Sequence, residues 1–214
     1  MPDQNGSLYG LTILSPIIDD ESATPSHDLQ IREYLASLPT DARSPFAIAP
    51  YTHLARLAVM DDVIYVGMPS CEEHLNFKYL VWETNFDGGQ RDSLDRYLKA
   101  LAGTVPNQID AIWSHCVGYP GTGDVGRFID YMKSCQLETT FYFAAVNDRS
   151  LVQTLQALQT QRAVADFVAR HRGLPAAQLQ QEFLHLAARL KRTPTPPPGG
   201  VTHARAIKMG GRNE

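Results

Sequence analysis

The chain has 214 residues, of which 43% are hydrophobic and 20% are charged. This composition is typical of a folded globular protein and excludes wholesale disorder. No apolar run approaches the ~20 residues that a membrane-spanning helix needs, and the polar N-terminus lacks the pattern of a signal peptide. From Arg189 to Glu214 there are six basic side chains and one acidic one, so the preceding residues carry −9 of the total charge of −4. An acidic body argues against nucleic-acid binding. We therefore expect a cytoplasmic protein with no membrane and no nucleic-acid partner.

The three cysteines are too few and too widely spaced for a disulfide framework or a zinc site built from cysteine alone. Cys71, Cys116 and Cys135 form no CxxC pair, and at least one thiol stays unpaired. A reducing compartment is the default for such a pattern. The metal content of the protein is not predicted by these residues.

Short apolar runs alternate with amphipathic segments along most of the chain. Runs of strand-forming residues predict β-strands, and apolar residues spaced i, i+3, i+4 and i+7 predict helices with one buried face. Ser26 is the expected N-cap of the first helix, with its hydroxyl on a first-turn amide. In chain order the predicted elements are a strand at 8–14, a helix at 31–38, strands at 53–60 and 77–86, a helix at 94–101, a strand at 111–117, a helix at 125–132 and a strand at 139–146.

The last third of the chain is predicted to be helical and then extended. A helical stretch runs from 150 to 191 and is interrupted near Gly173, Leu174 and Pro175. A segment rich in proline and glycine follows, which is typical of an extended linker. We therefore expect one domain over 1–191 and a basic tail over 192–214.

The predicted order through residue 117 is β-α-β-β-α-β, the ferredoxin-like pattern. Over residues 8–146 it resembles the ferredoxin-like α+β barrel superfamily, which includes dye-decolourising peroxidases, chlorite dismutases and small monooxygenases that need no cofactor. The resemblance implies an α+β fold with helices on one face of a sheet, to which this chain adds C-terminal helices, and a homodimer formed through the sheet or its edge. The alternative is that the strand at 139–146 and the late helices cover the sheet within one chain. Because this fold carries many functions, topology alone does not fix the activity.

The end of the 77–86 strand offers the first candidate site. Tyr79, Val81, Glu83 and Asn85 share one face of that strand by period two, and an apolar set occupies the other. Asp87 then stands in the loop Asn-Phe-Asp-Gly-Gly, which resembles in outline the GxxDG motif of dye-decolourising peroxidases, although the first glycine of that motif is absent. The simpler interpretation is a turn that uses glycine for its conformational freedom.

A second candidate lies in His-Cys-Val-Gly-Tyr-Pro-Gly, residues 115–121. His115, Cys116 and Tyr119 are reactive types beside a glycine-rich turn, with Trp113 just before them. The segment lacks the lysine and the spacing of a P-loop, so nucleotide binding is not predicted. His115 is equally well interpreted as a core histidine.

Antiparallel pairing permits Asp87 to meet either His53 or His115 at a strand end, with Arg56 about 10 Å further along its strand. The site that we predict therefore has Asp87, His115, Arg56 and His53 as catalytic residues. Glu83, Asn85, Trp113, Cys116 and Tyr119 are predicted to contact a small-molecule substrate.

The residues themselves leave the cofactor unknown. The peroxidase part of the resemblance implies haem, held by a helical histidine. His171 and His185 are the candidates by location, although each is more simply a surface residue. The leading functional hypothesis is an oxidoreductase with an enclosed apolar pocket. The alternatives are a monooxygenase or cyclase without a cofactor, and a non-catalytic binding or assembly subunit.

Overall fold

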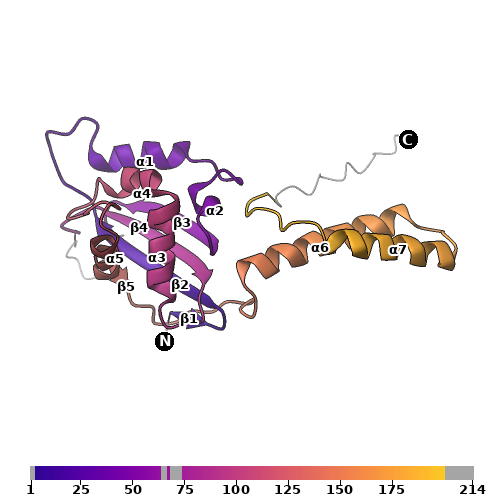
Figure 1. Cartoon of the computed structure of the whole chain (residues 1–214). Coiled ribbons are helices and arrows are strands. Elements are labelled where there is room, and N and C mark those ends of the chain that lie inside the picture. Colours follow the sequence, from indigo (N-terminus) through magenta and orange to yellow (C-terminus); the bar gives the residue numbers. More distant parts are fainter. Residues whose placement is uncertain (1–2, 64–66, 68–73, 201–214) are drawn as a thin grey trace, which may run out of the picture. The chain divides into compact units, whose positions relative to one another are not determined.

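The computed structural model describes residues 3–63, 67 and 74–200 (Figure 1). The chain divides into two compact units, residues 1–151 and residues 152–214. The boundary that the sequence predicts, between residues 191 and 192, falls within the second of these units. The elements in chain order are β1 (Gln4–Asn5), β2 (Leu8–Pro16), α1 (His27–Ser37), α2 (Pro45–Ile48), β3 (Thr52–Met60), β4 (Tyr79–Asp87), α3 (Ser93–Thr104), α4 (Pro106–Trp113), α5 (Val125–Ser134), β5 (Gln136–Leu137), α6 (Leu151–Arg170) and α7 (Ala176–Leu190).

The first unit is an α+β domain built on an antiparallel sheet, as the sequence predicted. The strands follow the order β1-β2-β4-β3, and β5 also pairs with β2. All pairings are antiparallel, and β2 and β4 are matched over their full nine residues, from Leu8 opposite Asp87 to Pro16 opposite Tyr79. Figure 1 shows α3, α4 and α5 over one face of this sheet. The opposite face of the sheet, which we call the open face, is the one that α3, α4 and α5 do not cover (Figure 1).

The core lies between the sheet and the helices, where the period-two pattern predicted it. In β4, Leu80, Trp82, Thr84 and Phe86 are all buried, and the alternate residues are partly exposed. Ile31 of α1, Leu98 of α3 and Phe128 of α5 are fully buried against them. The three amphipathic stripes read from the sequence therefore mark the core face of α1, α3 and α5 correctly.

Two predicted strands are absent from the structure. Residues 106–113 form α4, because Pro106 starts the helix and Ile109, Ile112 and Trp113 follow at helical spacing. A short apolar run such as 111–117 fits a buried helix or a strand equally well from its composition. Residues 139–146 form no strand, and the position beside β2 is taken instead by Gln136 and Leu137.

A smaller correction concerns the start of α1. Ser26 occupies the N-cap, as predicted, but its side chain bonds no backbone N–H. The Ser26 hydroxyl instead donates to Asp28 Oδ1 at 2.7 Å. The side chain of Asp28 is only 10% exposed and also pairs with Lys78, so the serine helps to satisfy a buried carboxylate.

The second unit contains α7 and all of α6 except its first residue. The break predicted near residues 173–175 separates the two helices, with Gly173 in the left-handed region at φ 82°. Phe167 of α6 contacts Phe183 of α7 edge to face, with ring centroids 5.9 Å apart. Gln156 and Gln159 of α6 bond Thr195 and Pro194, so the chain after α7 runs back along α6.

In the described part of the chain, every helix is too short or too polar to cross a membrane. The predicted loop cysteine Cys71, and residues 201–214 of the predicted tail, lie outside the described residues.

Candidate functional site

The structure brings together two of the four predicted catalytic residues. His53 Nε2 lies 2.7 Å from Asp87 Oδ1, and the two side chains are 17% and 14% exposed. His53 stands at the start of β3 and Asp87 at the end of β4. Because these strands are antiparallel neighbours, a strand start meets a strand end, as the sequence argument allowed. The imidazole and the carboxylate therefore form a half-buried pair that solvent still reaches.

A β-bulge directs His53 toward Asp87. Thr52 pairs with Phe86 and Leu54 with Asn85, so His53 is an extra residue in β3. Bulges are over-represented beside active sites, where they re-aim a side chain. The period-two pattern of the sequence contained no sign of this extra residue.

The residue before this bulge has an unusual backbone. Tyr51 has φ 76°, a conformation that is costly for a residue with a side chain. Its carbonyl oxygen accepts the Asp87 N–H at 3.0 Å, and its ring lies 5.0 Å below the guanidinium of Arg96. Arg96 also donates to the Asp87 carbonyl oxygen at 3.2 Å. Contacts on both sides thus hold Tyr51 in place beside the pair.

The two glycines after Asp87 are required by the backbone. A Cβ at Gly88 would lie 2.9 Å from the carbonyl carbon of Leu8, and Gly89 has φ 89°. The loop therefore passes too close to β2 for any side chain at Gly88. The turn interpretation of this motif is correct, and Asp87 is paired within it as well.

Asp87 has a second partner that the sequence did not suggest. Its Oδ1 accepts the backbone N–H of Leu151 at 2.8 Å. Leu151 is the first residue of α6, and a carboxylate near the first amides of a helix is favourable. One carboxylate oxygen therefore serves both the imidazole of His53 and the start of a helix.

Arg56 and Glu83 lie on the open face but do not join the pair. They face each other across β3 and β4, with Arg56 Nη1 3.3 Å from Glu83 Oε2 and side chains 72% and 45% exposed. Such an exposed ion pair contributes little stability. Asn85, nearer to Asp87 on the same strand, shares this face by alternation. Tyr142 lies against Gly10, the residue opposite Asn85, so this part of the face is already in contact with another segment of the chain, whereas Arg56 and Glu83 are accessible to a molecule that lies on the sheet.

His115 is far from Asp87, so the two do not share a pocket. Asp87 is level with Leu8 of β2, and the neighbour of His115, Cys116, is bridged to Ile17. The separation between Leu8 and Ile17 is about 30 Å in extended chain. His115 instead contacts His27, with their Nδ1 atoms 2.9 Å apart.

The remaining predicted residues of this segment belong to the core or to its border. Trp113 is fully buried in α4, and its indole N–H donates to Ser15 Oγ at 3.2 Å. Burial raises the pKa of the Cys116 thiol to about 12, which leaves it protonated and unreactive. Tyr119 donates to Asp110 Oδ1 at 2.7 Å, and burial and this bond raise the pKa of its phenol.

The haem candidates do not fit that cofactor. His171 is partly buried, its Nδ1 lies 2.8 Å from the carbonyl oxygen of Phe167, and its ring stacks on the Phe167 ring. His185 is exposed on α7. Neither lines either of the cavities described below, and one of these cavities is bordered by carboxylates that would repel the propionates of a haem. We derive no step through haem.

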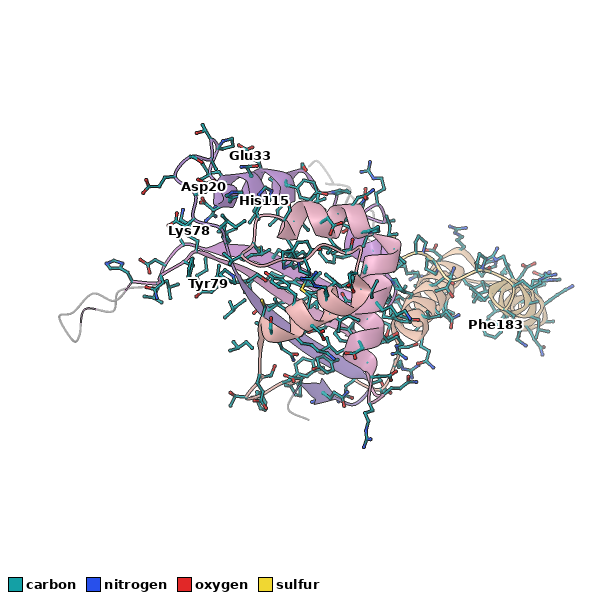
Figure 2. The ribbon with its side chains drawn as sticks, turned by 60° about the vertical axis from the view of Figure 1, so that its left-hand side comes forward. Asp20, Glu33, Lys78, Tyr79, His115 and Phe183 are labelled. Atoms are coloured by element: carbon teal, nitrogen blue, oxygen red, sulfur yellow. The ribbon has the colours of Figure 1, made fainter. Side chains whose placement is uncertain are left out.

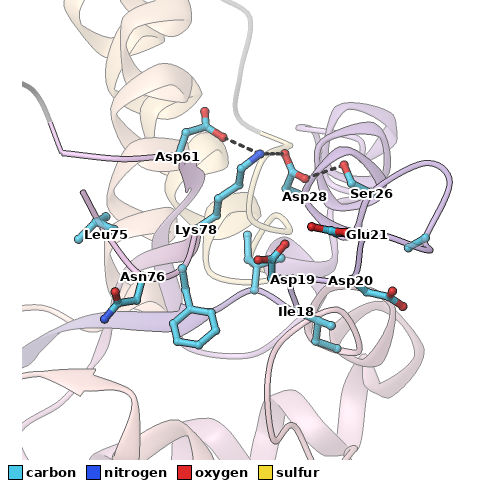
Figure 3. Close-up of a pocket in the computed structure, with 13 residues that line it drawn as sticks. Ile18, Asp19, Asp20, Glu21, Ser26, Asp28, Asp61, Leu75, Asn76 and Lys78 are labelled. Atoms are coloured by element: carbon cyan, nitrogen blue, oxygen red, sulfur yellow. Dashed lines mark hydrogen bonds and ion pairs between the residues drawn. The ribbon is translucent and has the colours of Figure 1, made fainter. Parts of the chain in front are cut away.

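One cavity, of about 400 Å³, was not expected from the sequence (Figure 3). Lys78 stands within it between Asp28 and Asp61, at 2.8 and 3.5 Å from their oxygens. The acidic loop before α1 completes the lining with Asp19, Asp20 and Glu21. Within residues 3–63, 67 and 74–200, no three His, Cys, Asp or Glu side chains gather so as to hold a metal ion.

No family model, no curated protein and no solved structure matches this chain.

Proposed function

We propose that the first unit is an enzyme of the ferredoxin-like α+β barrel type that carries out general acid–base chemistry on a small organic substrate. The observation that carries this proposal is the bond between His53 and Asp87, 2.7 Å long and half-buried. A carboxylate on one ring nitrogen fixes the orientation of an imidazole and stabilises its protonated form. With Nε2–H bound to Asp87, Nδ1 of His53 is the atom that accepts a substrate proton.

The local backbone supports a functional role for this pair. A bulge at His53 and a positive φ at Tyr51 fall within three residues of each other. Strain of this kind costs stability and clusters at active sites. Removal of a proton from carbon or oxygen begins both cofactor-independent oxygenation and cyclisation, so either reaction fits the pair. Oxygenation would make the protein an oxidoreductase.

Strand order supports the barrel type and a homodimer. β2 pairs with β1, β5 and β4, and β4 also pairs with β3, so the first and third long strands of the chain are central, as the proposed barrel type requires. The open face presents Leu54 and Leu137, each 53% exposed. A second copy over this face would cover these side chains and enclose a substrate beside Glu83 and Arg56.

The test uses the full-length protein. Thermal-shift screening of small phenols and organic acids identifies a ligand, and oxygen uptake or product formation is then followed. We expect His53→Gln and Asp87→Asn to lower turnover by at least a hundredfold while ligand binding persists. His74→Gln is the matched control, because His74 forms an exposed 2.7 Å pair with Asp62. Equal turnover in wild type and in both variants would refute the proposal.

The dimer has its own test. Light scattering should give twice the chain mass, and Leu54→Lys or Leu137→Lys should give the monomer. A wild-type monomer at micromolar concentration would rule the dimer out.

The second candidate function is an assembly subunit, and the late helices favour it. Their exposed apolar side chains are too numerous for a solvated hairpin. They are Val152, Leu158 and Val168 of α6, Leu174 of the turn, and Leu179, Phe183 and Leu184 of α7. If this unit mediates assembly, Phe183→Glu should lower the native mass and leave the first unit folded. An unchanged native mass would exclude the assembly role.

A further inference from the structure

The pair formed by His27 and His115 has no role in the proposed reaction, because it lies at the opposite end of β2 from His53. His27 is the first residue of α1, and His115 follows α4 in the turn that leads to α5. The two Nδ1 atoms are 2.9 Å apart, and the ring planes are tilted by 57°. In the described part of the chain, neither ring has another hydrogen-bond partner. The same nitrogen of each ring thus points at the other.

The backbone holds both rings where they are. The His115 carbonyl oxygen accepts the Ile18 N–H at 2.9 Å, and the next residues continue this attachment through the bridge between Cys116 and Ile17. His27 starts α1, whose side chain Ile31 is fully buried in the core. The approach of the two nitrogens is therefore fixed by the fold and does not depend on two flexible surface loops.

A hydrogen bond between the two Nδ1 atoms requires a particular protonation of each ring. One imidazole must carry its proton on Nδ1 and the other must not, so the two rings need opposite tautomers. A neutral imidazole with a free lone pair is also the form that binds a metal ion.

The distance between the two Nδ1 atoms can be compared with the spacing of two imidazole ligands in each coordination geometry. An ion that holds two imidazole nitrogens at about 2.0–2.1 Å and at right angles keeps them about 2.9 Å apart, whereas a tetrahedral ion keeps them about 3.4 Å apart. The observed 2.9 Å is the length of an ordinary hydrogen bond between the two nitrogens, and it is also the spacing that the right-angled arrangement needs. Square-planar and octahedral sites with nitrogen ligands are typical of Cu²⁺ and Ni²⁺.

The surroundings favour a cation with open coordination positions. His115 borders an open cavity of about 490 Å³, together with Glu33, Gln30 and Ser114. Glu33, His115 and Asp20 are labelled in Figure 2, and the charge of Asp20 interacts with His27. Two carboxylates in the vicinity and room for water ligands complement a doubly charged ion.

We propose that His27 and His115 form a two-imidazole binding site for a divalent transition metal ion, Cu²⁺ above Ni²⁺ and both above Zn²⁺. The protein contributes the two Nδ1 atoms, and water fills the remaining positions. The site is separate from the pair of His53 and Asp87, so it holds or fails independently of the enzyme proposed there.

The experiment titrates CuCl₂, NiCl₂ and ZnCl₂ separately into the full-length protein near pH 7, with calorimetry for stoichiometry and electron paramagnetic resonance for the Cu²⁺ ligands. We expect one Cu²⁺ per chain, with a signal split by two nitrogens. His27→Asn and His115→Asn should each weaken binding at least tenfold and remove one nitrogen from the signal. His171→Asn, in the second unit, is the control and should change neither.

Several results would overturn the proposal. They are a wild-type protein that binds no Cu²⁺, a Zn²⁺ affinity above that for Cu²⁺, and Cu²⁺ binding that is unchanged by both substitutions. Tryptophan fluorescence confirms that each variant is folded. If a variant is not, His27→Gln and His115→Gln replace it in the same titration.

Discussion

Breaking the contact between His53 and Asp87 should reveal a measurable coupling energy. A hydrogen bond to a charged group contributes about 1.5–3 kcal/mol when it is shielded from water, and these side chains are 17% and 14% exposed. We therefore expect a double-mutant cycle with His53→Ala and Asp87→Asn to give a coupling of about 1–3 kcal/mol.

Asp87→Asn removes the negative charge and leaves an oxygen at the position of Oδ1, which serves both partners, so the cycle measures the charged part of the contact with His53. Asn keeps an oxygen that can accept the Leu151 N–H, which lies 2.8 Å from Asp87 Oδ1. Asp87→Ala removes that acceptor as well, and should cost about 1–3 kcal/mol beyond Asp87→Asn because the Leu151 amide is left unpaired.

Urea unfolding followed by tryptophan fluorescence is the assay. Both tryptophans of the chain, Trp82 and Trp113, are fully buried in the first unit, so their emission reports on that unit alone. Each kcal/mol should also move the thermal midpoint by about 2–4 °C in a unit of this size. A coupling below about 0.3 kcal/mol, the error of such cycles, would refute the contact and with it the proposed base.

Three further predictions concern the core and its titrating groups. Leu98→Asp should cost more than about 3 kcal/mol in urea unfolding, because Leu98 is fully buried and the new charge has no partner; an unchanged midpoint would show that α3 is packed differently. The pKa of His115 is lowered from 6.5 by burial and by the charge of His27, so the unfolded chain binds more protons just below pH 6.5. Stability should therefore rise with pH up to about 6.5 and level off above it, and His115→Asn should flatten the profile. Cys116, whose pKa burial raises to about 12, should react with iodoacetamide only after unfolding, and mass spectrometry that finds it labelled in the native protein would contradict its burial.

The sequence predicted the core of the first unit well, because periodicity depends on burial alone. The stripe that contains Leu98 and the alternation of Leu80, Trp82 and Phe86 are confirmed by their burial. The strand predicted at 111–117 was wrong, since Trp113 suits a buried helix as well as a strand and only its packing against Ser15 decides.

Only part of the candidate site could be predicted from the sequence. The topology allowed Asp87 to meet His53, and it does. The same argument allowed His115, whose strand does not exist, and it could not foresee His27 as the partner of that residue. The bulge at His53 and the φ of Tyr51 depend on the register between β3 and β4. No residue type near them predicts this register.

Asp87 contacts both His53 and the Leu151 N–H. Comparing these two contacts helps to decide whether the pair of His53 and Asp87 stabilises the fold or takes part in a reaction. To hold the start of α6, Asp87 needs only the Leu151 N–H, and that contact makes no demand on β3. To reach the same oxygen, His53 requires an extra residue in β3 beside a strained Tyr51. A fold that needed only the helix contact would gain stability from a regular β3, because strain of this kind costs about 1–3 kcal/mol. The irregularity of β3 therefore supports the proposed role of the imidazole, which the double-mutant cycle and the turnover assay measure.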